Sequence, residues 1–151
     1  MRALLVAWSV LLAAVLSSFA EKPSPAPSPE PVAASSLRVK LMDLGGALSN
    51  EGFKMRDRIW SGKIESGQPQ RLAVNLFRGN HYWFCAAVDP EGRTVKVSLF
   101  QADGTPVTGV DHAEPGLAAV GVTAVTTGQY FVQIETTGGP ASDFCLLYLF
   151  K

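Results

Sequence analysis

The chain has 151 residues, of which 47% are hydrophobic and 17% charged, and its 13 basic and 13 acidic residues give a formal net charge of zero. Because the charges are interspersed and form no basic stripe, this composition excludes a typical nucleic-acid-binding protein. A domain of about 115 residues buries around two thirds of the surface of its unfolded chain, so we expect one domain.

The first twenty residues, "MRALLVAWSVLLAAVLSSFA", have the layout of a secretory signal peptide. Arg2 precedes an apolar run from Ala3 to Leu16, and the small residues Ser18 and Ala20 end the segment. A membrane anchor needs about 20 apolar residues, and this run is shorter. We therefore predict a signal peptide over residues 1–20, export to the periplasm or the extracellular space, and no membrane span after cleavage.

The stretch "EKPSPAPSPEP" alternates proline with small residues. Such a sequence favours an extended, semi-rigid polyproline segment without a core of its own. We interpret residues 21–36 as a linker and residues 37–151 as the folded domain. The alternative is a proline-rich recognition motif. We favour it less, because most domains that bind such motifs are cytosolic.

Within the domain, alternation of apolar and polar residues recurs, and we find no segment with a convincing helical period over three turns. The alternation of Leu37, Val39 and Leu41 predicts a short first strand. Further strands are predicted, in chain order, over residues 59–64, 72–76, 82–88, 95–99, 120–122, 130–134 and 143–151.

Turn residues separate these strands. "FRGN" joins two of them and predicts a hairpin, "DPEGR" is a strong turn signal, and Asp103-Gly104 indicates another tight turn. Residues 108–116 are expected to form a looser loop. About eight short strands with turns between them predict an all-β domain, a two-layer antiparallel β-sandwich of jelly-roll type.

Three segments, "LAVNLFRGNHYWF", "VKVSLFQADGTPV" and "TTGQYFVQI", follow one another in the chain. In this order they resemble the bacterial pre-peptidase C-terminal domain family, and the resemblance covers about residues 58–150. It implies a non-catalytic jelly-roll module that assists secretion, binds polymeric or protein substrates, or mediates contacts. Some family members are similar to carbohydrate-binding modules in shape, and some bind calcium.

Two features depart from that family. The strand before the Asp103-Gly104 turn often carries aspartates in the family, whereas this chain has Thr94, Lys96 and Ser98 at those places. We therefore expect no calcium and no other cofactor. No peptidase domain accompanies the module in this sequence.

The residues offer little for catalysis. No Gly-x-Ser-x-Gly elbow, His-Glu-x-x-His motif or phosphate loop is present. His81 and Cys85 are four residues apart, which on one strand separates their Cα atoms by about 13 Å. We therefore predict that the protein is not an enzyme.

One short stretch, "VDHAEPG", could hold a metal ion. Asp111, His112 and Glu114 supply three oxygen or nitrogen donors within four residues, and an ion would need further ligands from elsewhere. A solvated polar loop is the alternative, and we favour it because no second group of ligands is identifiable.

Trp60 and Trp83 are the candidate ligand-binding residues. An exposed aromatic ring can stack on a sugar ring, because its face is broad and apolar. Burial in the core or in an interface is the alternative, since tryptophan is highly buried on average.

The two cysteines suggest a disulfide, because exported proteins fold in an oxidising compartment. The family resemblance implies that Tyr82 and Phe84 face the core, so Cys85 faces the opposite side of its strand. In the last strand, alternation from Phe144 places Cys145 on that side too. On neighbouring antiparallel strands the two could come within disulfide distance, so we predict a Cys85–Cys145 bond, with two buried thiols as the fallback.

The same alternation places Trp83, Leu147 and Leu149 on the outward face. This patch is more apolar than a soluble monomer usually exposes, so something must cover it. The predicted first strand is one candidate cover, and a second protomer or a partner protein is the other.

Taken together, these features predict an exported binding or accessory module that contacts a protein partner or an extracellular or cell-envelope polymer. A carbohydrate-binding module using Trp60 or Trp83 is the first alternative. A small hydrolase with an unrecognised site is the second alternative. The small number of candidate catalytic residues argues against it.

Overall fold

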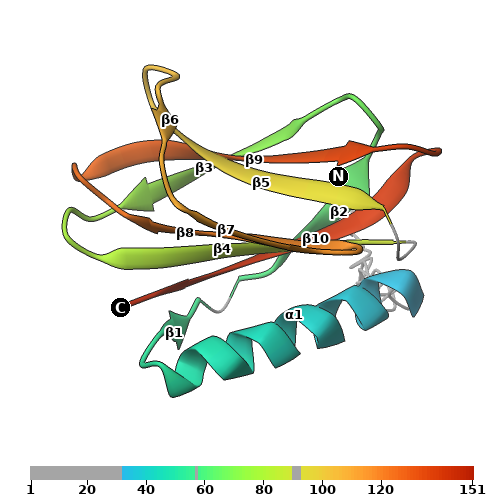
Figure 1. Ribbon diagram of the computed structural model, residues 1–151, viewed down its shortest axis with the longest axis horizontal. Coiled ribbons are helices and arrows are strands. Elements are labelled where there is room, and N and C mark those ends of the chain that lie inside the picture. Colours follow the sequence, from blue (N-terminus) through green and yellow to red (C-terminus); the bar gives the residue numbers. More distant parts are fainter. Residues whose placement is uncertain (1–31, 57, 90–92) are drawn as a thin grey trace, which may run out of the picture.

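The computed structural model describes residues 32–56, 58–89 and 93–151 (Figure 1). The predicted signal peptide and most of the predicted linker lie outside these residues. The described chain forms one helix and two antiparallel sheets, and no helix in it is long and apolar enough to cross a membrane. The elements in chain order are α1 (Val32–Asn50), β1 (Lys54–Met55), β2 (Trp60–Ile64), β3 (Gln70–Leu76), β4 (His81–Val88), β5 (Thr94–Gln101), β6 (Pro106–Val107), β7 (Val110–Glu114), β8 (Leu117–Thr123), β9 (Gly128–Thr137) and β10 (Ser142–Phe150).

The strands form two layers with the order of a jelly roll. In the first sheet, which we call sheet A, β1 and β2 both pair with β10, and the order continues through β4 and β8 to β7. Sheet B has the order β3-β9-β5-β6. Most connections carry the chain from one sheet to the other, so that β2-β10-β4-β8 faces β3-β9-β5-β6. The predicted two-layer antiparallel sandwich of jelly-roll type is confirmed.

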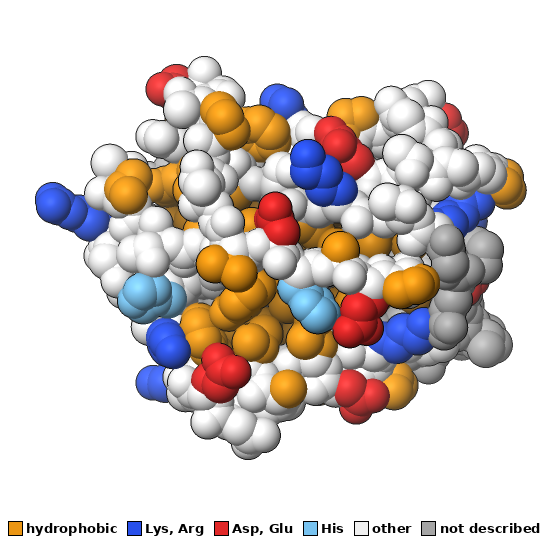
Figure 2. Space-filling model, in the orientation of Figure 1, with side chains coloured by type: hydrophobic (Ala, Val, Ile, Leu, Met, Phe, Trp, Pro, Cys, Tyr) orange, Lys and Arg blue, Asp and Glu red, His pale blue; other side chains and the backbone are white. Residues whose placement is uncertain are grey.

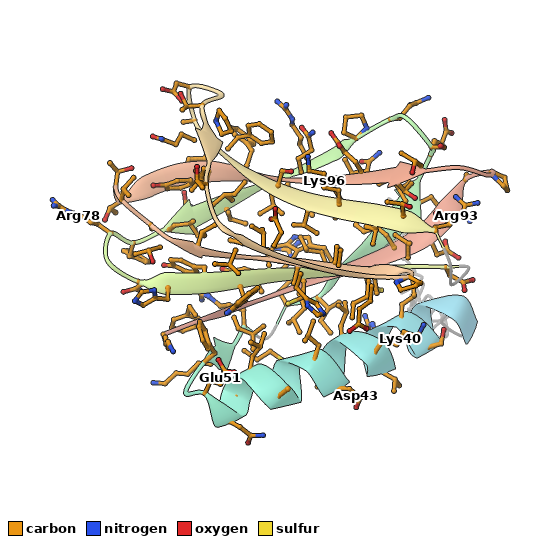
Figure 3. All side chains as sticks on the ribbon, in the orientation of Figure 1. Lys40, Asp43, Glu51, Arg78, Arg93 and Lys96 are labelled. Carbon is orange, nitrogen blue, oxygen red and sulfur yellow. The ribbon has the colours of Figure 1, made fainter. Side chains whose placement is uncertain are left out.

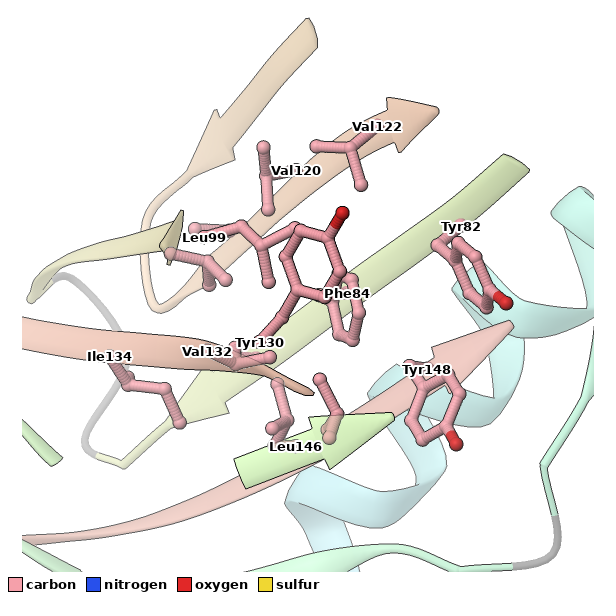
Figure 4. Close-up of a cluster of buried hydrophobic side chains, with 14 of the residues drawn as sticks. Tyr82, Phe84, Leu99, Val120, Val122, Tyr130, Val132, Ile134, Leu146 and Tyr148 are labelled. Atoms are coloured by element: carbon pink, nitrogen blue, oxygen red, sulfur yellow. The ribbon is translucent and has the colours of Figure 1, made fainter. Parts of the chain in front are cut away.

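The inner core lies between the two sheets and is rich in aromatic rings (Figure 4). Phe84 and Leu146 are fully buried there, and the Phe84 and Tyr148 rings lie 5.4 Å apart between centroids. Tyr130 buries its ring while its hydroxyl donates a hydrogen bond to the Thr126 carbonyl at 3.0 Å. The prediction that Tyr82, Phe84 and the alternate residues of β10 face the core is confirmed.

The predicted hairpin between β3 and β4 is wrong, because the two strands belong to different sheets. "FRGN" does form a turn, in which Asn80 N–H donates to the Phe77 carbonyl at 3.2 Å and Gly79 has φ of +87°. Gly79 N–H also donates to the Ala124 carbonyl at 2.8 Å. The turn therefore carries the chain across the sandwich, so that the apolar sides of β3 and β4 face each other.

The predicted first strand is also wrong, because residues 37–41 lie within α1. Leu37, Leu41 and Leu48 are buried on one side of the helix together with half-buried Leu44, a spacing of four, three and four residues that follows the helical period. Val39, which the alternation paired with Leu37, is instead 58% exposed. Since α1 begins at Val32, the end of the predicted linker belongs to the helix as well.

A Schellman motif ends α1. Gly52 has φ of +90°, its N–H donates to the Ser49 carbonyl at 3.0 Å, and Phe53 N–H donates to the Leu48 carbonyl at 3.3 Å. Phe53 and Leu48 are buried in the same cluster, which is the hydrophobic contact that usually accompanies this motif. The chain thereby turns back from the helix into β1.

The helix covers part of the outer face of sheet A (Figure 1). It packs mainly on β10 and β4. A Cβ added at Gly45 would lie 2.5 Å from Met55 Cε and 3.3 Å from Leu147 Cδ2, so glycine lets the helix approach the sheet closely. The outward apolar patch is therefore covered by the chain's own N-terminal segment, as a helix and not as a strand. This outer cluster contains Leu37, Leu41, Leu48, Phe53, Cys85, Ala87, Ala119, Cys145, Leu147 and Leu149.

Candidate binding groove

Exposure rises steadily across the outer face of sheet A along one row of paired residues. Leu149 on β10 lies opposite Trp83 on β4, Trp83 opposite Gly121 on β8, and Gly121 opposite Val110 on β7. Leu149 is fully buried under α1, Trp83 is half-buried, and Val110 is 67% exposed. In Figure 2, hydrophobic side chains are visible at the surface between the two histidines of the chain. The helix therefore leaves the β8–β7 side of the sheet open.

The indole of Trp83 lies against Gly121. A Cβ added at Gly121 would be 2.7 Å from Cζ2, 2.8 Å from Cε2 and 2.9 Å from Cη2 of the Trp83 ring, so no larger residue fits there without moving the ring. Trp83 also packs against the outer cluster. Its position is therefore held from two sides, while part of the ring remains accessible.

An open groove of about 650 Å³ begins at this ring. β4 and β8 form the floor and one wall of the groove, and the segment that enters β7 forms the other wall. The loop after α1 and the C-terminal residue Lys151 close one end. The residues that bound it include both apolar and polar side chains, among them Phe53, His81, Trp83, Val110, Thr123 and Lys151.

Lys151 places a cation at the end of the groove. The backbone of Lys151 exchanges two hydrogen bonds with His81, of 2.9 and 3.0 Å, which tie the C-terminal residue to β4. Its Nζ lies 4.3 Å from the centroid of the Phe53 ring and donates to the Glu51 carbonyl at 3.4 Å. Glu51 itself follows the last turn of α1 (Figure 3). Lys151 therefore places a cation beside an aromatic ring where the groove ends.

His81 and Thr123 form the polar pair of the groove. Thr123 Oγ1 and His81 Nδ1 are 2.8 Å apart, and both residues are exposed. A nucleophilic hydroxyl also needs a third group that orients the base. In the part of the chain that the structure describes, no acidic side chain is hydrogen-bonded to His81. The pair is suited to hydrogen bonding with a ligand.

Trp60 lies on the opposite face of sheet A from Trp83. It is half-buried, packs against the inner core and stacks on Tyr148, with ring centroids 5.6 Å apart and planes 20° apart. The two predicted ligand-binding tryptophans therefore do not form one platform. Both tryptophans are half-buried, so each is neither the fully exposed residue of the binding hypothesis nor the fully buried residue of the alternative.

The predicted metal-ligating residues lie on β7, an edge strand, and not in a loop. Alternation separates Asp111 from the other two, since Asp111 pairs with Val120 of the inner core while His112 pairs with Ala119 of the outer cluster. His112 Nε2 and Glu114 Oε1 are 3.3 Å apart. Among residues 32–56, 58–89 and 93–151, no three His, Cys, Asp or Glu residues are grouped to hold a metal ion.

Thr94, Lys96 and Ser98, which the resemblance compared with calcium-binding aspartates, lie on β5. Thr94 and Lys96 are exposed on the outer face of sheet B, Ser98 is half-buried, and Lys96 lies opposite Glu135 in the strand register (Figure 3). Two hydroxyls and an ammonium group lack the carboxylates that calcium sites depend on.

The predicted Cys85–Cys145 disulfide is not formed. Both cysteines are buried on the outer face of neighbouring strands, as expected, but the register is offset, since Cys85 pairs with Leu147 and Cys145 with Ala87. Such diagonal neighbours are about 7–8 Å apart at Cα, beyond the usual range for a disulfide. Burial raises the pKa of the Cys85 thiol to about 12, so this thiol is not a nucleophile at neutral pH.

Several residues of the groove escaped the sequence analysis, among them Phe53, Val110, Gly121, Thr123 and Lys151. Val110 and Gly121 stand in segments that were predicted as a loop and as the middle of a strand, and Lys151 is the last residue. Gly121 carried a signal, because an isolated glycine within a strand often marks a close approach. The position of Lys151 beside Phe53 had no signal, since it depends on the register between β10 and β4.

The sequence matches no protein-family model, and no curated protein matches it significantly.

Proposed function

We propose that this protein is an exported, non-catalytic binding module that holds an extended segment of a protein partner in the groove beside Trp83. The observation that carries the proposal is the position of this groove next to an open sheet edge. All five residues of β7 are exposed, and no described strand pairs with its outer edge. An extended peptide can add to such an edge by backbone hydrogen bonds while its side chains enter a neighbouring pocket.

The composition of the groove fits a peptide. Trp83 and Val110 offer an apolar contact, His81 and Thr123 offer hydrogen bonds, and Lys151 offers a cation. Aromatic anchors surrounded by polar groups are typical of protein interfaces. A strand added beside β7 would place alternate side chains over Val110 and the groove.

Two features of the sequence support the other parts of the proposal. The first twenty residues have the pattern of a signal peptide, which favours export. The resemblance to pre-peptidase C-terminal domains favours an accessory role without catalysis, in line with the incomplete His81–Thr123 pair.

Selection from a phage-displayed library of random peptides tests the proposal. We expect the intact exported chain to enrich peptides with alternating apolar residues, Trp83→Ala to abolish their binding, and Trp83→Phe to retain part of it. Trp60→Ala is the matched control and should bind normally. Failure to enrich any peptide, or equal binding by Trp83→Ala, would contradict the proposal. Light scattering would show whether the partner is a second copy of the chain.

Carbohydrate binding at the same ring is the second candidate. The half-exposed Trp83 ring beside the hydroxyl of Thr123 and the imidazole of His81 favours it, since sugars combine an apolar face with hydroxyl groups. Binding on a glycan array that Trp83→Ala abolishes would support this function over a peptide.

Turnover assays distinguish peptide binding and carbohydrate binding from catalysis. A panel of ester, peptide and glycoside substrates should show no activity. Activity that a single His112→Ala change removes would overturn the non-catalytic proposal.

A further inference from the structure

Strand β7 presents an open edge in the part of the chain that the structure describes. It pairs with β8 on one side, and no described strand pairs with its other side. All five of its residues are exposed, and its pairing with β8 runs without a bulge from Val110 to Glu114. The strand holds no lysine and no proline, which commonly protect such an edge. The edge is therefore able to accept another strand.

The turn between β7 and β8 determines which backbone groups face that edge. Pro115 and Gly116 form a two-residue turn, in which Gly116 has φ of +75°. In such a turn the carbonyl of the first flanking residue accepts the N–H of the last, so the backbone of Glu114 faces β8. Backbone groups alternate in direction along a strand, so those of Asp111 and Ala113 face outward.

A second copy of β7 fits this edge best in one antiparallel register. When Asp111 of each copy lies opposite Ala113 of the other, both outward residues of both strands exchange hydrogen bonds. A register centred on Ala113 would place Asp111 opposite Pro115, which has no N–H to donate. A register centred on Asp111 would place two carboxylates directly opposite each other, which is destabilising. The twofold axis of the best register therefore passes between the two copies of His112.

The side chains complement each other in this register. His112 of one copy would face His112 of the other on the outer face of sheet A, and its Nε2 already lies 3.3 Å from Oε1 of Glu114 on its own strand. Glu114 would lie opposite Val110 of the other copy and diagonal to its His112, so that two carboxylates flank the two imidazoles. Val110, which is 67% exposed, would gain the methylene groups of Glu114 as a cover.

We propose that the protein forms a symmetrical dimer in which the β7 edges of two copies pair, so that sheet A continues from one copy into the other. The proposal rests on the same open edge as the proposed function, but not on the groove beside Trp83. An extended peptide that adds to β7 therefore competes with the second copy, and the dimer is the form of the protein without a peptide.

Light scattering of the intact exported chain over a range of concentrations tests the dimer. We expect the mass to rise from that of one chain to that of two. Ala113→Pro should keep the mass of one chain, because it removes an outward N–H and leaves the pairing with β8 intact. Ala113→Thr is the matched control and should dimerise, since it changes the same exposed side chain and keeps the N–H. Thermal melting checks that each variant is folded.

Amide hydrogen exchange tests the pairing without a substitution. At concentrations where the dimer forms, the amides of Asp111 and Ala113 should exchange at least about tenfold more slowly than in the dilute chain. The amides of His112 and Glu114 face β8 in both states, so their exchange should change little with concentration. Exchange at Asp111 and Ala113 that is independent of concentration would contradict the proposal.

His112→Lys tests the register. Two ammonium groups would then face each other across the twofold axis, so dimerisation should weaken by up to about fivefold. His112→Thr is the control and should dimerise normally, because a pair of threonines suits facing strands. Stronger dimerisation of His112→Lys would contradict the register, since the ammonium group would then lie opposite Glu114.

Two further results would overturn the dimer: a mass of one chain at every concentration, and equal dimerisation by Ala113→Pro and Ala113→Thr. Trp83→Ala separates the dimer from the proposed function, because this variant should lose peptide binding and keep the dimer. Loss of the dimer in Trp83→Ala would show that the copies meet through the groove and not through β7. A normal dimer without any enriched peptide would contradict the proposed function alone.

Discussion

The two faces of sheet A differ in how completely they are covered. The inner face meets sheet B, and Phe84 and Leu146 in its middle are fully buried. The outer face meets α1, which packs mainly on β10 and β4 and leaves Val110 on β7 exposed. A sheet can cover another sheet across its width, whereas a single helix is only about 10 Å wide. The groove beside Trp83 is a consequence of that difference in width.

The largest effect that we expect concerns the reactivity of Cys85 under the helix. Its pKa of about 12 in the folded chain, against an ordinary value of 9.0, lowers its thiolate fraction at neutral pH roughly a thousandfold. Native alkylation followed by mass spectrometry should therefore label Cys85 very slowly, and denaturant should restore rapid labelling. Rapid labelling of the native chain would mean that α1 does not cover this face.

The same pKa makes stability depend on alkaline pH. Because the folded pKa is raised, the contribution of this thiol is fully present below about pH 9 and is lost as the pH rises towards about 12. Unfolding free energies measured across this window should fall in the wild type more steeply than in Cys85→Ala. Parallel pH profiles would contradict the assignment.

Phe84→Ala tests the inner face and should cost about 3–5 kcal/mol of unfolding free energy, because it empties a ring-sized space that two sheets cannot close. Urea denaturation measures it. Phe77→Ala is the control, since Phe77 is 55% exposed and should cost well under half as much. Similar losses in both variants would contradict the description of the core.

Leu41→Ala tests the outer face and should cost about 2–4 kcal/mol, somewhat less than Phe84→Ala, because a helix can shift to fill part of a cavity. Its neighbour Met42 is 48% exposed, so Met42→Ala should stay within about 0.5 kcal/mol. Denaturation of both variants measures the difference. If residues 37–41 formed a strand, as the alternation suggested, Val39→Ala and not Met42→Ala would match the loss in Leu41→Ala.

Gly121→Ala should have the smallest effect on stability, about 1–3 kcal/mol, because the added methyl group pushes the Trp83 ring away from the sheet. Gly46→Ala is the control, since a Cβ there meets nothing within 4 Å, and it should leave stability equal or slightly higher. Tryptophan fluorescence should change in Gly121→Ala alone. An unchanged spectrum would mean that Trp83 does not rest on Gly121.

The sequence predicted the sandwich well because alternation reports directly which side of a strand is buried. Tyr82, Phe84, Cys85 and Cys145 all face the predicted sides. It failed for residues 37–41, where five residues alternate by chance within a longer helical pattern that Leu44, Leu48 and Gly52 continue. A longer window would have shown the leucine spacing and the glycine that ends the helix.

The candidate sites were less predictable than the fold. Trp60 and Trp83 were predicted as candidate ligand-binding residues with burial as the alternative, but their separation onto opposite faces depends on strand alternation in β2 and β4 together with the sheet order.

The sequence by itself determined the class of fold and the inward side of most strands, since local alternation and turn residues encode both. Only the tertiary structure decided the register between β4 and β10. In this register Cys85 and Cys145 are diagonal neighbours and not direct partners, so they are too far apart for a disulfide in the folded chain. It also decided how far α1 reaches across sheet A. Register and coverage depend on the packing of segments far apart in the chain, and the alternation within a single strand carries no record of them.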